Sequence, residues 1–124
     1  MAMSTAKERS EQEWPWDDSL DTLIAAPEHH RLLMENDRVR VLETAIRQGD
    51  RTPIHTHRWP AALYVVSWSH FVRYDDRGNI IVDSRNVEAL REPPPSLWSA
   101  ALPPHSLENV GSGDLRIISV ELKG

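Results

Sequence analysis

The sequence predicts an all-β chain folded as a sandwich or barrel. Short runs rich in Val, Ile and Leu recur along the 124 residues, and residues typical of turns separate them. Nine prolines stiffen the connections, and hydrophobic residues make up 40% of the chain, which is enough for one core. About nine or ten strands at this spacing favour two packed antiparallel sheets.

The first residues differ in composition from the rest. Residues 1–16 are expected to form a flexible, polar N-terminal tail that ends in an anchor, because Trp14 and Trp16 are too apolar to remain exposed. A short helix is expected after this anchor, since acidic and serine side chains there can cap its start and Pro27 would end it. Residues 17–124 then form a single domain.

Alternation and turn residues divide the domain into strands. The expected strands cover residues 29–34, 38–47, a short stretch around 55–57, 61–69 with an alternative continuation through 72, 80–82, 97–100 and 115–122. The expected turns lie at 35–37, 49–50, 75–79, 103–104 and 111–114, and those at 75–79 and 111–114 are predicted to be hairpins. Residues 84–92 fit either a loop or a helical turn.

Two histidines two residues apart carry the clearest chemical signal. On a strand, His55 and His57 would point to the same face and present two imidazoles side by side. Neutral imidazole is the commonest nitrogen ligand for transition metals, and the chain has no cysteine to compete with it. If the fold brings His105 to this pair, the three form an open metal site. His29 and His30 are adjacent, so they would face opposite sides, and no role is predicted for either.

Two motifs resemble those of the cupin superfamily. Gly49-x₅-His55-x-His57 is similar to the start of the first cupin motif, and His105-x₃-Asn109 is similar to the end of the second. The resemblance implies a double-stranded β-helix, or jelly roll, with a short N-terminal helix or arm. It also implies a divalent metal held by His55, His57 and His105, and a homodimer.

One departure from the cupin pattern affects the expected chemistry. The glutamate ligand usual in cupins would fall at Ala61, which cannot bind a metal. Some cupins without this glutamate are three-histidine iron dioxygenases, so the resemblance implies a non-haem iron dioxygenase acting on a small organic acid or carbonyl compound. A metal-dependent lyase or isomerase and a non-enzymatic ligand-binding cupin are the alternatives. Iron is expected for an enzyme, with zinc, nickel and manganese left open.

A site without a carboxylate ligand favours a small anionic ligand, because the metal's charge is otherwise uncompensated. Three nearby arginines could attract such an anion, and three aromatic residues are candidates for the pocket wall. These are Arg47, Arg51 and Arg58, and Trp59, Tyr64 and Trp98. Glu43 and Glu121 lie on half-buried strands and either could face the cavity, but no catalytic residue is identified.

Charge and hydropathy exclude several partners. The net charge is −5 and no basic block stands out, so nucleic acid is not expected as a partner. No apolar run is long enough to span a membrane and no signal-peptide pattern is present. A soluble cytoplasmic protein is therefore expected.

Overall fold

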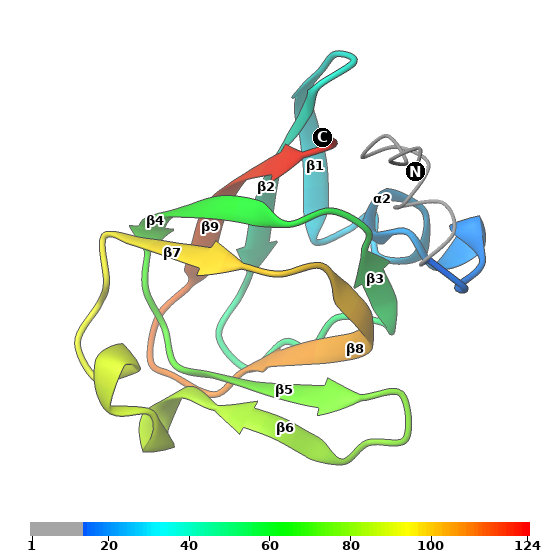
Figure 1. Ribbon diagram of the computed structural model, residues 1–124. Coiled ribbons are helices and arrows are strands. Elements are labelled where there is room, and N and C mark those ends of the chain that lie inside the picture. The colour runs from blue at the N-terminus through cyan, green and yellow to red at the C-terminus, as the bar shows by residue number, and fades with distance from the viewer. Residues whose placement is uncertain (1–13) are drawn as a thin grey trace, which may run out of the picture.

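The structure, a computed structural model, describes residues 14–124 and consists of two antiparallel sheets (Figure 1). The five-stranded sheet has the order β1-β2-β9-β4-β7, and the four-stranded sheet has the order β3-β8-β5-β6. The strands are β1 His30–Glu35, β2 Val39–Ile46, β3 His55–His57, β4 Ala61–Ser67, β5 Phe71–Asp75, β6 Ile80–Asp83, β7 Ser96–Ser99, β8 Leu102–Asn109 and β9 Leu115–Leu122. The predicted double-sheet all-β architecture is confirmed.

Alternating side chains build the core between the two sheets. In β2 every second residue is buried, and Leu42 and Ile46 are almost fully inaccessible. β9 alternates in the same way, and its inward residues Leu115 and Ile117 pack with Ile46 and Phe71. This burial drives the pairing of the sheets, since each side chain of this size gains roughly 1.5–3 kcal/mol on leaving water.

Two predicted connections are wrong, because the chain changes sheets where a continuous strand or a hairpin was expected. The strand predicted over 61–69 ends at Ser67, and β5 begins in the other sheet after a corner at residues 68–70. Residues 111–114 likewise join β8 to β9, which lie in different sheets and do not pair. Gly111 belongs to this crossing: a Cβ atom there would lie 2.6 Å from the backbone nitrogen of His70.

The turn predicted at Pro103 and Pro104 is also wrong, because both residues lie inside β8. β3 pairs His55 with His105 but His57 with Leu102, so two β8 residues face one β3 residue. This is a β-bulge, and Pro103 and Pro104 are the two bulged residues. Proline is tolerated there because a bulge interrupts the regular backbone hydrogen bonds between the strands.

The N-terminal arm contains two short helical turns. η1 spans Asp18–Leu20 and is capped by the Asp17 carboxylate, and α2 spans Thr22–Ala25 and is capped by Asp21. The connection at 84–92 also forms two turns, η2 Ser84–Asn86 and η3 Glu88–Leu90. Residues 1–13 of the flexible tail predicted for residues 1–16 lie outside the described residues. Trp14 and Trp16 are half-buried and pack edge to face, with ring centroids 4.8 Å apart.

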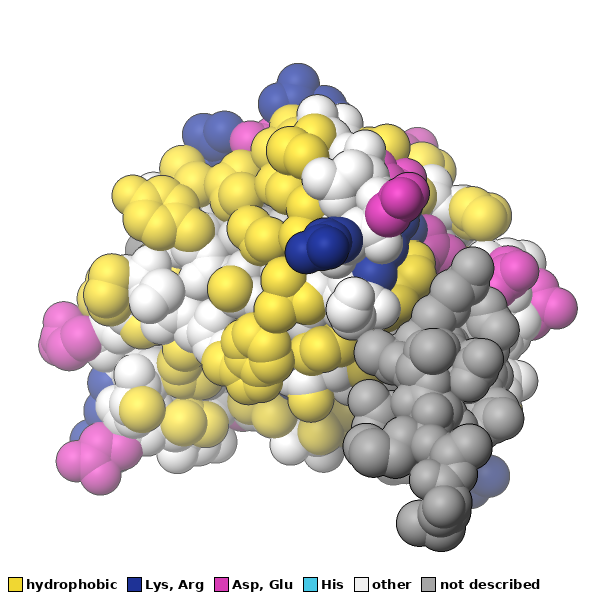
Figure 2. Space-filling model, turned by 45° about the horizontal axis from the view of Figure 1, so that its top comes forward, with side chains coloured by type: hydrophobic (Ala, Val, Ile, Leu, Met, Phe, Trp, Pro, Cys, Tyr) yellow, Lys and Arg dark blue, Asp and Glu magenta, His cyan; other side chains and the backbone are white. Residues whose placement is uncertain are grey.

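The outer face of the five-stranded sheet carries an apolar row that crosses all five strands. Cross-strand partners define it: Met34, Val41, Val120, Ala62 and Trp98. Figure 2, which brings the top of Figure 1 forward, shows hydrophobic side chains gathered on one face of the molecule. Among residues 14–124, no helix is long and apolar enough to cross a membrane.

Candidate metal centre

Four histidines from three strands gather between the sheets. His30 opens β1, His55 and His57 form the two ends of β3, and His105 lies on β8 directly opposite His55. The ring centroids of His55 lie 5.1 Å from His57, 4.8 Å from His30 and 4.4 Å from His105. The fold therefore brings together the three histidines singled out in the sequence.

His30 is the member that sequence reasoning missed. One ring nitrogen from each of His30, His55 and His57 lies within 4.8 Å of the others, a spacing compatible with a shared metal ion. His105 lies beside this cluster, with its ring centroid 4.4 Å from that of His55 and 5.7 Å from that of His57, but it is not one of the three residues whose nitrogens meet the 4.8 Å spacing. The structure thus offers four imidazoles where three were expected.

The four rings are held in the same way. Each Nδ1 faces an oxygen at 2.8–3.1 Å: the carbonyl of Ala26 for His30, of Pro53 for His55 and of Pro103 for His105, and the carboxylate of Glu121 for His57. A carbonyl oxygen can only accept, so Nδ1 must carry the proton and the Nε2 lone pair is left available. Within residues 14–124, no Nε2 of these four rings has a hydrogen-bond partner. This is the tautomer and orientation that a metal-binding imidazole needs.

Burial keeps the four imidazoles neutral. Desolvation is the main cause that lowers the pKa of each ring, and mutual repulsion adds to it for His30, His57 and His105. The pKa of His57 falls to about 3. Neutral imidazole is the form that binds metals, so at pH 7 no proton has to be removed before binding.

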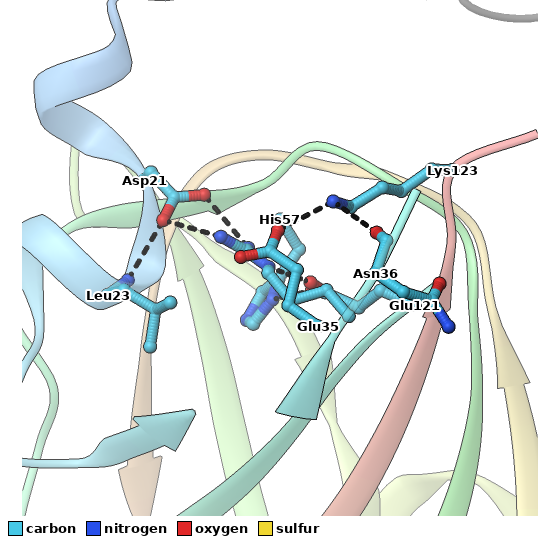
Figure 3. A network of polar contacts seen from close by, with 8 residues as sticks. Asp21, Leu23, Glu35, Asn36, His57, Glu121 and Lys123 are labelled. Carbon is cyan, nitrogen blue, oxygen red and sulfur yellow. Dashed lines mark hydrogen bonds and ion pairs between the residues drawn. The ribbon is translucent and has the colours of Figure 1, made fainter. Parts of the chain in front are cut away.

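A chain of ion pairs that runs from Glu121 through Arg40 to Asp21 contacts His57 at its Nδ1 (Figure 3). The Glu121 carboxylate is fully buried. It accepts one hydrogen bond from His57 Nδ1 at 3.1 Å and another from Arg40 Nε at 2.6 Å. Arg40 in turn donates two hydrogen bonds to Asp21, at 2.9 and 3.0 Å. Burial raises the pKa of Glu121, while the Arg40 guanidinium acts in the opposite direction and favours the carboxylate. Of the two glutamates left open by the sequence, Glu121 faces the cavity; Glu43 pairs with Arg116 on the outer face.

The histidines line a cavity of about 90 Å³ between the sheets. Its remaining wall is mostly apolar and includes Leu63, Leu107, Leu115 and Ile117. This volume has room for several waters or one small organic molecule.

Of the three aromatic residues predicted for the pocket, only Trp59 lines the cavity. Tyr64 and Trp98 are 62% and 63% exposed, because they alternate with the inward-facing Leu63 and Leu97 on the opposite face of the sheet. The prediction for these two side chains is corrected accordingly.

The arginines are also distributed differently from the expectation. Arg51 stacks over the Tyr74 ring at 3.9 Å and donates to Ser106, while Arg47 is exposed. Neither these two nor Arg58 lines the cavity, but Arg73 of β5, which was not singled out in the sequence, does.

Asn109 has a structural role. Its side chain accepts from Ser69 Oγ and the Gly111 nitrogen, and it donates to the carbonyls of Ile46 and Gly113. These four hydrogen bonds tie the end of β8 to the crossing that leads into β9.

Comparison with known proteins identifies the fold. No model of a known protein family and no curated protein matches the sequence. Among solved structures, the chain is similar to a cupin domain from Bordetella pertussis Tohama I, at 15% identity over 77% of this chain and 92% of that one, with a TM-score of 0.57.

Two further structures are similar to this chain. One is an RmlC-like cupin family protein with a double-stranded β-helix fold from Methanocaldococcus jannaschii, at 12% identity over 75% of this chain and 77% of that one, with a TM-score of 0.53. The other is the polyketide cyclase RemF from Streptomyces resistomycificus, at 21% identity over 77% of this chain and 64% of that one, with a TM-score of 0.48. With its two antiparallel sheets and its likeness to the two cupin structures at TM-scores of 0.57 and 0.53, the chain has the cupin fold.

Proposed function

We propose that this protein is a metal-dependent enzyme that binds a divalent ion through His30, His55, His57 and His105 and acts on a small organic acid. One observation carries the proposal: all four Nδ1 atoms are engaged by oxygens, so the four neutral Nε2 atoms are left without a partner among residues 14–124, on side chains that line the cavity. Four lone pairs on rings gathered around one cavity form a donor set that a metal ion can use in place of water.

The donor set favours a transition metal over calcium or magnesium, which prefer oxygen ligands. A divalent ion held by neutral nitrogens supplies a strong Lewis acid and, if it is iron, oxygen chemistry. The chain's own residues hold the ion, exclude bulk water with apolar walls and leave room for one small ligand. A non-haem iron dioxygenase is the most concrete form of the proposal. With zinc or nickel, the same site favours a lyase or isomerase.

Elemental analysis of the purified full chain tests the metal site. We expect close to one transition-metal ion per chain in the parent and loss of that ion in His57→Ala. His70→Ala is the control, because His70 bonds to Ser84 Oγ and does not line the cavity. A parent protein that contains no metal and shows no thermal stabilisation with Fe, Zn, Ni or Mn would contradict the proposal and leave a non-enzymatic binding protein.

We also propose that the protein is a homodimer in which a second copy covers the apolar row on the five-stranded sheet. Met34 and Trp98 at the two ends of the row are 49% and 63% exposed, which is unusual for large apolar side chains in a row of this kind. A twofold pairing would bury the row on both copies at once. Light scattering should give about twice the 14.2 kDa chain mass, and Trp98→Glu should return it to one chain. If the parent protein at tens of micromolar scatters light with the mass of one chain, the dimer is refuted.

A further inference from the structure

Arg73 is a cation on the wall of the histidine cavity. Arg73 lies on β5 and is the cross-strand partner of Leu107 on β8. Leu107 is two residues from His105 on the same strand. Positions two apart on a strand share a face, so Arg73 and His105 lie on the same inner face as diagonal neighbours. Both side chains line the cavity.

The guanidinium has no partner within residues 14–124. No carboxylate there forms an ion pair with Arg73, and its Nε is buried without a hydrogen bond. Partial burial lowers the pKa of Arg73, whereas the guanidinium of the buried Arg40 is held by two carboxylates. Burying an unpaired cation is costly unless an anion joins it.

The charges around the cavity favour an anion that comes from outside the chain. Arg40 pairs with both Asp21 and Glu121, and with Arg73 the formal charges of these four side chains sum to zero. A divalent ion on the histidines would then leave an excess of positive charge in a cavity with apolar walls, where the low dielectric strengthens its attraction for an anion.

We infer that Arg73 binds the carboxylate of a small organic acid that lies between it and the metal on the histidines. This inference rests on the proposed function and names its ligand class. The planar guanidinium matches a carboxylate through two parallel hydrogen bonds. Leu63, Leu107, Leu115 and Ile117 contact the short apolar part of the acid, and the volume of about 90 Å³ limits that part to a few carbon atoms.

The test uses the full chain loaded with Co²⁺, whose visible spectrum reports on anions that approach the metal. Propionate is the probe, and phosphate is the comparison because it is an oxyanion of equal or higher charge that has no apolar part. We expect propionate to bind the parent more tightly than phosphate. Arg73→Met should weaken propionate binding by about 10- to 100-fold, the effect of losing a charge-assisted pair, and leave the metal content unchanged. Arg73→Lys should lose less propionate affinity than Arg73→Met, because lysine keeps the positive charge.

Arg47→Met is the matched control, since Arg47 is an exposed arginine outside the cavity. Metal content is measured on every variant, so a parent that binds no Co²⁺ counts against the proposed function. A Co²⁺-loaded Arg73→Met protein that binds propionate within about twofold of the parent overturns the assignment of Arg73. A loaded parent that prefers phosphate, or that binds neither anion, overturns the carboxylate class. If Arg73→Met does not fold, Arg73→Lys decides: affinity equal to that of the parent overturns the inference.

Discussion

Replacing His30 by alanine is expected to lower the metal affinity by about two orders of magnitude. The ring nitrogen of His30 lies within 4.8 Å of those of His55 and His57, and its Nδ1 is fixed by the Ala26 carbonyl at 3.1 Å. Loss of even an outer partner of a metal ligand costs about 10- to 100-fold in affinity, so loss of a ligand should cost at least as much. Competition with a chromophoric chelator gives the affinity directly.

His29→Ala is the matched control for this prediction. His29 is the adjacent residue, is equally buried and donates to Asp50 at 2.9 Å, so its loss should reduce stability without affecting the metal. His105→Ala completes the series and separates two ligand sets. Parent-like affinity in His30→Ala with loss in His105→Ala would support the three ligands that the sequence resemblance implies and exclude His30 from the site.

A β-bulge explains why the sequence did not reveal His30. Near the turn, β1 and β2 pair Glu35 with Arg40 and Met34 with Val41, and the same register continued would place His30 opposite Ala45 on the outer face. The register shifts by one residue between Leu32 and Met34, so His30 pairs with Thr44 and faces the cavity. A one-residue slip reverses the face of every side chain beyond it, and no residue type at this position signals it.

The features that could be predicted are those with local causes. Alternation in β2 and β9, the glycine turn before β6 and the shared face of His55 and His57 all follow from sequence periodicity. The contributions of Arg73 and Glu121 depend on which strands become neighbours across the two sheets. Pairing over such long sequence separations follows from the fold, so neither residue could be assigned in advance.

Glu121 occupies a position that relates it to the glutamate missing from the first cupin-like motif. That glutamate would fall at Ala61 on β4, and Glu121 of β9 is the cross-strand partner of Ala61. β9 thus carries a buried carboxylate directly beside the position where the glutamate would lie on β4. This carboxylate accepts a hydrogen bond from His57 Nδ1 and is not placed as a metal ligand. A carboxylate behind an imidazole raises its basicity, so negative charge still reaches the site through His57.

Glu121→Ala is therefore expected to have two large effects. The free energy of unfolding should fall by about 1.5–3 kcal/mol, because Arg40 loses its charge-assisted hydrogen bond at 2.6 Å to Glu121 while it keeps its two hydrogen bonds to Asp21. The metal affinity should fall by about 10- to 100-fold, because Nδ1 of His57 loses the acceptor that orients the ring. Urea denaturation and chelator competition measure the two effects separately.

Two further variants distinguish the ionic role of Glu121 from simple packing. Glu43→Gln is the control, since Glu43 forms its ion pairs with Arg31 and Arg116 on the outer face and should change stability by less than about 1 kcal/mol. Glu121→Gln keeps the shape and an acceptor for His57 but removes the charge. If charge is what the carboxylate contributes, this variant should keep the orientation of the ring yet still lose metal affinity. Parent-like affinity in Glu121→Gln would show that Glu121 positions His57 without supplying charge to the metal site.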